Sequence, residues 1–259
     1  MGESPAPGAP GRALEIAVQD VAGVRIAQDA GADRVELCVA LAATGGLTPS
    51  IGLVEAAVAS GMPVHALIRT RPGGFCYDAG ELDVLVRDVR AVVRAGAAGV
   101  VVGALTPDGA VDQDAVRALV AAAGGASVTF HRALDVVADA RAALDRLAAL
   151  GVTRGLTSGG ATRSIDGRDA LAELAAHARG RGEVMAGGGV RGGDIGALFA
   201  AGVDAVHLSA RRSVRDPGAA GPGGGSGGYD VTDEATVRAA VAARRQAHWA
   251  TLGRQGVGG

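Results

Sequence analysis

One pattern repeats along most of this chain and restricts its fold more than any other feature. A short run rich in β-branched residues is followed by a turn, an alanine-rich amphipathic stretch, and a glycine that leads into the next run. The segments DAGADRVEL and AAGVDAVHL are examples of this helix-to-strand connection, in which the glycine ends a helix and the next strand begins. Eight predicted strands begin near Ala13, Arg34, Pro63, Gly99, Ser127, Gly155, Glu183 and Ala205.

Strands that alternate with helices form a parallel sheet, and eight of them favour closure into a barrel. The chain has 259 residues, which suits one barrel of roughly 250 residues with no second domain. The sequence therefore predicts a single α/β domain, a (β/α)8 TIM barrel, over residues 13–259.

Three segments lie outside the repeat. Residues 1–12 are rich in Pro, Gly and Ala, lack the apolar core of a signal peptide, and are expected to form a disordered N-terminal arm. Residues 213–228 are expected to form a Gly-rich loop. A terminal helix is expected at about 233–250, with Thr232 as a candidate N-cap.

The charge balance excludes several classes of partner. The 25 basic and 27 acidic residues give a net charge of −2, so we expect no nucleic acid partner and no membrane partner. All 25 basic residues are arginine, which excludes chemistry through a lysine Schiff base. The chain has two cysteines and no apolar run of membrane-spanning length, so we expect a cytoplasmic protein with reduced thiols.

Polar side chains recur at alternate positions along several predicted strands and so share one face of each strand. Buried charges are costly unless they are paired or lie at the open end of the barrel. One such pair, Glu15 with Arg34, could be purely structural, but convergence from several strands predicts a functional pocket at the C-terminal end of the barrel. The residues concerned are Glu15; Arg34, Glu36 and Cys38; His65 and Arg69; Thr129 and His131; His207 and Ser209.

Five of the predicted pocket residues are candidate catalytic groups: Glu15, Glu36, His65, Arg69 and His131. His131 is the preferred general acid or base, because it lies at the mouth of its strand and imidazole titrates near neutral pH. His65 lies deeper, and a buried hydrogen-bonding role is its alternative.

Two glycine-containing segments are candidate anion sites. In RTRPGGFCY, Arg71 joins Arg69 beside a glycine turn, an arrangement that suits a carboxylate or phosphate. In MAGGGVRGGD, Gly187, Gly188 and Gly189 follow the seventh strand, and Ser209 follows the eighth. Barrels that bind phosphate commonly do so with the backbone amides of these two loops.

A metal site is the competing interpretation. Cys38 and Cys76, with the pocket histidines, are soft ligands of the kind that Cu(I) prefers. The sequence contains no closely spaced pair such as CxxC or HxxxH. Because the candidate ligands lack this spacing, the sequence favours a site for anion or sugar-phosphate chemistry over a metal site.

The segments ADRVELC, GGLTPS, FCY, VTFHRA, LTSGG and MAGGGVR resemble, in this order, the CutC copper-homeostasis family over roughly Leu14–Ala210. The resemblance implies a cytoplasmic, homo-oligomeric TIM barrel that handles copper, with Cys38 and Cys76 as the metal ligands. Gly74 departs from the family, which has an acidic residue before FCY, and the tail from Ser213 is particular to this chain.

Three hypotheses follow. The first is a copper homeostasis protein that binds copper. The alternative is a TIM-barrel enzyme that uses acid/base chemistry on a small anionic or phosphorylated carbohydrate-like substrate. The third is a scaffold or binding module, which a pocket closed by internal salt bridges would favour.

Overall fold

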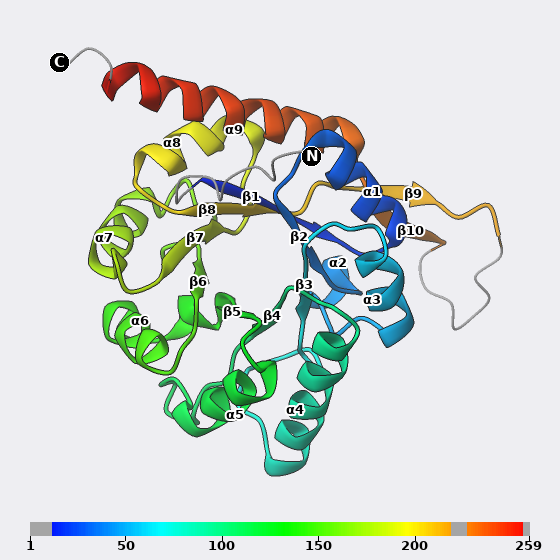
Figure 1. Cartoon of the computed structure of the whole chain (residues 1–259), viewed down its shortest axis with the longest axis vertical. Helices are drawn as coiled ribbons and strands as arrows, with labels where there is room; N and C mark the ends of the chain where they lie inside the picture. The colour runs from blue at the N-terminus through cyan, green and yellow to red at the C-terminus, as the bar shows by residue number, and fades with distance from the viewer. Residues whose placement is uncertain (1–11, 219–226, 256–259) are drawn as a thin grey trace, which may run out of the picture.

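The structure is a computed structural model that describes residues 12–218 and 227–255. Eight parallel strands close into a barrel in the order in which they occur along the chain, and helices surround it (Figure 1). The predicted (β/α)8 barrel is confirmed. The strands are β1 (Ala13–Val18), β2 (Arg34–Leu37), β3 (Val64–Leu67), β4 (Gly99–Val102), β5 (Ser127–Phe130), β6 (Arg154–Thr157), β7 (Glu183–Gly187) and β8 (Ala205–Leu208).

The helical elements lie between and after these strands, and α9 packs across α8 and α1 at the side of the barrel (Figure 1). They are α1 (Val21–Ala30), α2 (Leu41–Thr44), α3 (Ile51–Val58), α4 (Ala79–Arg94), α5 (Gln113–Ala123), η1 (Arg132–Val136), α6 (Ala140–Ala149), α7 (Arg168–Ala178), η2 (Gly192–Asp194), α8 (Ile195–Ala200) and α9 (Glu234–Gln255). No helix of the described segments is both long and apolar enough to cross a membrane.

Local sequence explains where several helices begin and end. Asp20 and Asp112 lie before α1 and α5, and their carboxylates accept from the backbone N–H groups of the first turn. Gly31 ends α1 with a φ of 92°, a left-handed conformation that favours glycine. The predicted glycine terminus is therefore confirmed for this helix.

The end of the chain differs from the sequence prediction. Residues 213–215 and 228 of the expected loop are not loop but belong to an antiparallel hairpin of β9 (Arg211–Arg215) and β10 (Gly228–Thr232), which projects from the barrel (Figure 1). Residues 219–226 of the expected loop lie outside the described residues. Thr232 pairs with Arg211 in this hairpin, and Asp233 instead accepts from the backbone N–H of Thr236 at 3.2 Å. Of the expected N-terminal arm, residues 1–11 lie outside the described residues.

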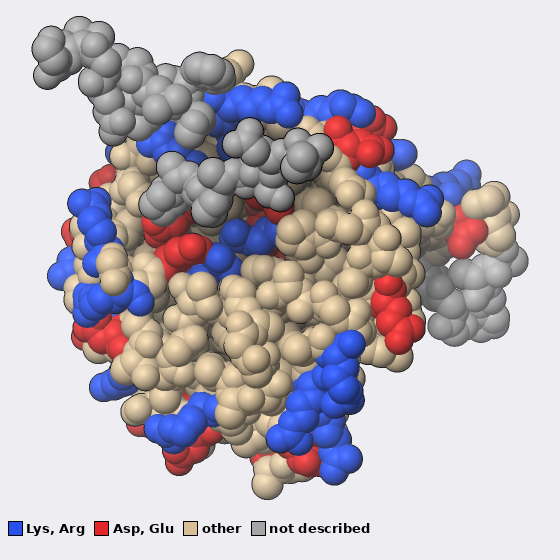
Figure 2. All heavy atoms as spheres, in the orientation of Figure 1, with Lys and Arg blue, Asp and Glu red and all other residues tan. Residues whose placement is uncertain are grey.

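The core has two parts because alternate side chains of each strand face opposite ways. One set packs between strands and helices and includes Leu14 and Ile16 on either side of Glu15. The barrel interior contains two small apolar clusters, Cys38 with Leu67 and Val101, and Leu156 with Met185 and Ala205. The rest of the described interior is rich in buried charge, and Figure 2 shows acidic and basic side chains together near the centre of one barrel face.

Candidate functional site

A cavity of about 890 Å³ opens at the C-terminal end of the barrel strands. This is the end at which TIM-barrel enzymes place their active sites. The cavity is lined by residues from several strand ends, including Glu36, Arg69, His131, Gly188, His207 and Ser209. The polar pocket that the sequence predicted is therefore present as an open space.

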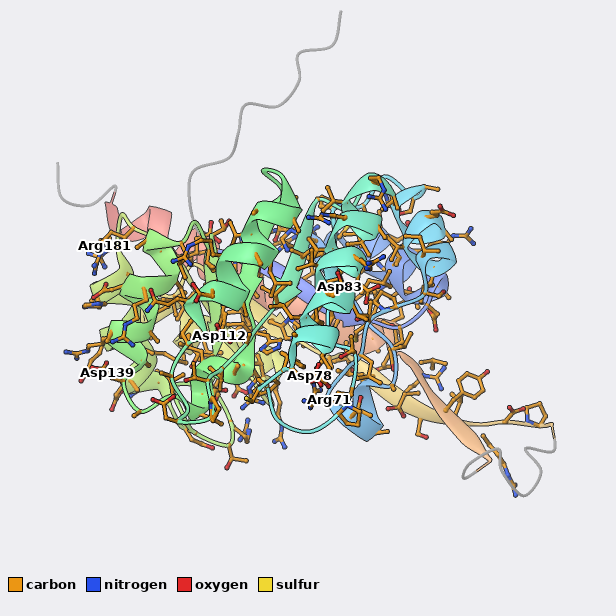
Figure 3. All side chains as sticks on the ribbon, turned by 90° about the horizontal axis from the view of Figure 1, so that it is seen from below. Arg71, Asp78, Asp83, Asp112, Asp139 and Arg181 are labelled. Carbon is orange, nitrogen blue, oxygen red and sulfur yellow. The ribbon has the colours of Figure 1, made fainter. Side chains whose placement is uncertain are left out.

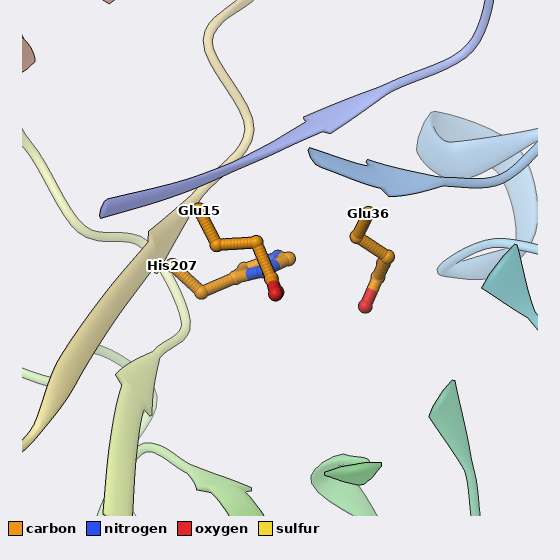
Figure 4. Close-up of side chains that lie close together, drawn as sticks. All are labelled: Glu15, Glu36 and His207. Atoms are coloured by element: carbon orange, nitrogen blue, oxygen red, sulfur yellow. The ribbon is translucent and has the colours of Figure 1, made fainter. Parts of the chain in front are cut away.

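Glu15 organises the base of this cavity. It lies in register with Arg34 of β2 on one side and His207 of β8 on the other. Its Oε2 accepts from Nε of Arg34 at 2.6 Å, and its Oε1 lies 2.8 Å from Nδ1 of His207. Figure 4 shows the Glu15 and His207 side chains converging from adjacent strands. The Glu15–Arg34 pair, which the sequence offered as a possible structural salt bridge, is present, and the same carboxylate also orients an imidazole.

These contacts set the charges of Glu15 and His207. Burial favours the neutral acid, but the hydrogen bond with His207 and the charge of Arg34 outweigh it and hold the pKa of Glu15 well below its usual range. Burial alone would lower the pKa of His207, whereas the charges of Glu36 and Glu15 raise it above its usual value. Glu15 is thus an ionised carboxylate that favours protonation of its imidazole partner.

Glu36 faces this pair from the neighbouring strand (Figure 4). The residue is 5% exposed, and burial raises its pKa to about 7. Ligand atoms of Glu15, Glu36 and His207 all lie within 4.8 Å of one another. The cluster can therefore share a proton at neutral pH, and its oxygen and nitrogen atoms could also hold a cation.

His65 lies deeper in the barrel, as expected, but its Nδ1 has no hydrogen-bond partner among the described residues, so the buried hydrogen-bonding role is not shown. Its Nδ1 is 3.7 Å from Oε2 of Glu15, and the residue does not line the cavity. Burial lowers its pKa to about 4, so the ring is neutral at physiological pH. Gly99 makes room for it, since a Cβ at that position would lie 2.9 Å from the ring.

Arg69 lines the cavity and also holds its loops. Its Nη1 donates to the carbonyls of Thr44 at 2.6 Å and Gly46 at 3.1 Å, and its Nη2 donates to that of Gly73 at 2.9 Å. The guanidinium also lies over the ring of Phe75. Arg69 therefore joins the loop after β2 to the loop after β3.

Arg71 lies outside the cavity, on the rim beside the start of α4 (Figure 3). It forms an ion pair with Glu81, and its Nη1 and Nη2 donate to the carbonyls of Gly74 at 3.1 Å and Cys76 at 2.8 Å. The exposed Gly74 belongs to this rim turn and does not line the cavity. The structure therefore separates Arg71 from the other predicted anion-binding residues.

His131 lines the cavity at the end of β5. Its Nδ1 accepts from the backbone N–H of Ala133 at 3.1 Å. Burial, together with the charge of Arg69, lowers its pKa to about 3. The imidazole is therefore neutral at physiological pH, and so low a pKa does not favour the role of general acid or base preferred from the sequence.

Only part of the predicted glycine-rich anion site lies in the cavity. Gly188, Gly189 and Ser209 line the cavity, whereas Gly187 does not. A Cβ at Gly187 would lie 2.5 Å from Leu156 and 3.2 Å from Cβ of His207, so this glycine permits close packing behind His207.

Sequence reasoning did not select four arginines that line the cavity near these glycines. Three of them are neutralised by aspartates: Arg132 by Asp135 at 2.7 Å, Arg163 by Asp194 at 3.0 Å, and Arg211 by Asp230 at 2.6 Å. The fourth, Arg191, is exposed; its backbone N–H donates to the carboxylate of Asp194 at 2.9 Å, but among the described residues its guanidinium forms no ion pair with an acidic side chain. The segments FHRA, GGGVR and HLSARR place Arg132, Arg191 and Arg211 shortly after strand ends, and this position could have identified these three; Arg163 lies six residues beyond the end of β6 and has no such signal.

The two cysteines do not form a common site. Cys38 is completely buried against Leu67 and Val101, and burial raises its pKa well above the usual range. Cys76 is exposed on the rim. Within the described residues, the only group of three His, Cys, Asp or Glu side chains placed to hold a metal is Glu15, Glu36 and His207, and it contains no thiol.

The fold and the site together define a TIM barrel with a carboxylate–imidazole cluster and an arginine-rich rim at its C-terminal mouth. The CutC family model matches residues 12–212. A CutC family protein of Caulobacter vibrioides is 48% identical over 185 residues, which cover 71% of this chain and 75% of the relative. One of Xylella fastidiosa is 45% identical over 234 residues, which cover 88% and 87%.

A solved structure of CutC from Streptococcus agalactiae is also similar. It superposes with a TM-score of 0.72 at 31% identity and covers 75% of this chain and 97% of that one. The chain therefore belongs to the CutC family, and the resemblance seen in the sequence is confirmed.

Proposed function

We propose that this chain is an enzyme that moves protons on a small anionic substrate of the phosphorylated carbohydrate type, bound in the mouth of the barrel. The observation that carries the proposal is the cluster of Glu15, His207 and Glu36 at the base of the cavity. A buried acid beside an imidazole that a second carboxylate orients is an arrangement suited to general acid–base catalysis.

The three residues take different roles. Glu15 remains ionised and holds Nδ1 of His207, which leaves Nε2 of that ring available for proton transfer. Glu36 has a pKa of about 7, so both its ionised and protonated forms are populated at neutral pH. Glu36 and His207 would thus exchange a proton with the substrate, while Glu15 orients the ring.

The other part of the cavity supports binding of an anion. Gly188 and Gly189 follow β7, and Ser209 follows β8, at the positions where barrels of this fold commonly bind phosphate. The positive side chain of Arg191 lies in the same lining. We assign the phosphate to this part, so that the carbon skeleton extends toward Glu36.

Exchange of carbon-bound hydrogen with solvent tests the proposal. Aldose and ketose phosphates of three to six carbons would be incubated with the protein in D₂O and followed by proton NMR. We expect at least one compound to exchange, and we expect Glu36→Gln to slow exchange by about 100-fold or more. Glu183→Gln is the matched control, because Glu183 pairs with Arg154 outside the cavity. Absence of exchange across the whole set contradicts the proposal.

Copper handling is the second candidate function. It is supported by the name of the Streptococcus agalactiae neighbour, a copper homeostasis protein. The described residues do not fit a Cu(I) thiolate site, because Cys38 is buried with a raised pKa and Cys76 is exposed. The oxygen and nitrogen atoms of Glu15, Glu36 and His207 suit a harder ion such as Cu(II).

Calorimetric titrations with Cu(I) and Cu(II) separate these possibilities. Stoichiometric Cu(I) binding that Cys38→Ser abolishes would support a thiol site and contradict the donor set inferred here. Cu(II) binding that Glu36→Gln weakens but Cys38→Ser does not would support copper at the carboxylate–imidazole cluster.

A cytoplasmic location and a homo-oligomeric state also remain proposals, and both are supported by family resemblance. The β9–β10 hairpin projects from the barrel, and its residue Tyr229 is 55% exposed. Light scattering coupled to size-exclusion chromatography measures the oligomeric state directly. A monomeric mass at all concentrations contradicts that part of the proposal.

A further inference from the structure

One ring nitrogen of His131 has a hydrogen-bond partner and the other has none. The backbone N–H of Ala133 donates to Nδ1, so Nδ1 presents its lone pair. Nε2 is buried and has no partner among the residues that the structure describes. In the neutral ring the proton therefore lies on Nε2, which leaves a buried N–H donor without an acceptor.

The surroundings hold this ring in place. The rings of Phe75 and His131 have centroids 4.7 Å apart. Gly103 of the neighbouring β4 loop leaves the space that the imidazole occupies, because a Cβ there would lie 2.2 Å from Cε1 of His131. Buried polar groups in folded proteins almost always find a partner. His131 lines the cavity, and its Nε2–H is a fixed donor without an acceptor. This indicates that an atom of a bound ligand accepts the hydrogen bond.

His131 and the acid–base cluster lie on opposite sides of the mouth. In a closed barrel of eight strands, β5 lies across from β1, and β2 and β8 flank β1. Glu36 belongs to β2 and His207 to β8, whereas His131 follows β5. All three residues line the same cavity, so one small molecule can lie between them.

We propose that Nε2–H of His131 donates a hydrogen bond to a carbonyl oxygen of the substrate, while Glu36 and His207 face the carbon–hydrogen bond beside that carbonyl. The inference rests on the proposed function, because it takes Glu36 and His207 as the proton-transfer groups. It narrows the substrate to a phosphorylated compound with an aldehyde or ketone group, and the reaction to isomerisation or epimerisation next to that group.

The step balances without any further reactant. The carboxylate of Glu36 takes the proton from the carbon next to the carbonyl, and the C–H electron pair forms a carbon–carbon double bond. The carbonyl π electrons move onto the oxygen, and the resulting enolate receives the hydrogen bond of His131. A neutral imidazole is a suitable donor to such an oxygen, and triosephosphate isomerase uses one in this way. Return of the proton to the other face of the same carbon restores the original carbonyl and gives the epimer. In isomerisation the proton goes to the former carbonyl carbon, the hydroxyl on the adjacent carbon becomes the new carbonyl, and the proton of that hydroxyl passes to the enolate oxygen.

The test compares two probes by calorimetry. 2-Phosphoglycolate carries a planar carboxylate that imitates the enolate, and inorganic phosphate lacks it. We expect His131→Leu to weaken 2-phosphoglycolate binding about 10- to 100-fold and to leave phosphate binding within about twofold. His131→Gln, which keeps an N–H donor, should restore part of the affinity. His177→Leu is the matched control, since His177 pairs with Asp145 on the helix layer.

A measurement on the unmodified protein keeps the inference testable if the variants fail to fold. Nitrogen-15 NMR should show His131 as the neutral Nε2–H form between pH 5 and 8, with its Nε2 resonance shifted by 2-phosphoglycolate but not by phosphate. Binding of 2-phosphoglycolate that does not depend on His131 overturns this inference and leaves the proposed function standing. Binding of neither probe overturns both.

Discussion

The carboxylate of Glu15 holds the imidazole of His207 through Nδ1, at a distance of 2.8 Å. The two residues lie directly opposite each other in the ladder between β1 and β8. The other oxygen of the same carboxylate accepts from Arg34 at 2.6 Å, so Glu15 joins three strands at the base of the cavity. Any change at Glu15 therefore affects both the stability of the barrel and the protonation of His207.

We predict that Glu15→Gln lowers the free energy of unfolding by about 3–5 kcal/mol, because it leaves Arg34 buried without its counter-ion. The pKa of His207 should fall as well, since it loses a hydrogen bond to a negative charge. Urea unfolding measures the first effect and NMR titration of the ring the second. In the control Glu173→Gln, whose side chain is 65% exposed and pairs with the exposed surface residue Arg141, we expect a much smaller loss. Equal losses would contradict the prediction.

The eightfold repeat of strand-like and helix-like segments was sufficient to predict the barrel. The alternation of polar and apolar residues along each strand was sufficient to predict that Glu15, Glu36 and His207 share its interior. The pairing of Glu15 with His207 depends on the register between the first and last strands, which are 192 residues apart. No local pattern specifies that register. The sequence therefore indicated a polar pocket but could not identify His207 as the imidazole that Glu15 orients.

Local context also separated residues that looked equivalent. Arg69 and Arg71 are two positions apart, yet one lines the cavity and the other pairs with Glu81 on the rim. The role of His131 depends on the Ala133 amide, which makes Nδ1 an acceptor, and on burial, which keeps the ring neutral. Such effects arise from turns and packing rather than from residue type.

We predict that acid destabilises the fold below pH 6.5 through two buried histidines. His65 and His131 have pKa values of about 4 and about 3 in the folded protein, whereas unfolded histidine titrates near 6.5. The unfolded state therefore binds more protons in this window, and stability falls as pH falls by about 1 kcal/mol per pH unit for each ring. Urea unfolding at several pH values should show a shallower loss for His131→Gln.

Glu36 acts in the opposite direction in the same experiment. Its pKa is raised to about 7 in the folded protein, so between about 4.5 and 7 the folded state holds a proton that the unfolded state has released. Glu36 thus stabilises the fold at acidic pH, and this contribution is lost as pH rises through 7. Glu36→Gln should make the acid loss steeper than in the unmodified protein. A shallower loss would show that the carboxyl is not protonated in the folded state.

The two thiols should differ sharply in reactivity. Cys76 is exposed, whereas Cys38 is fully buried with a pKa raised well above the usual range. At pH 8 an aromatic disulfide reagent should modify one thiol quickly in the folded protein and the second only on unfolding. Cys76→Ser should abolish the fast phase and Cys38→Ser should preserve it. Fast modification of both cysteines would contradict the burial of Cys38 and would support a Cu(I) site formed by thiols.

Two glycine-to-alanine substitutions should have opposite effects on stability. At Gly103 the new Cβ would lie 2.2 Å from Cε1 of His131, so the imidazole must move out of its space and overpacking costs about 1–3 kcal/mol. Gly196 lies within α8, and a Cβ there meets no atom within 4 Å. Because alanine favours a helix over glycine by about 1 kcal/mol, Gly196→Ala should stabilise the protein. Urea unfolding gives both values, and the NMR resonances of the His131 ring should shift only in Gly103→Ala. If the ring stays in place in that variant, the close packing between Gly103 and His131 does not position the ring.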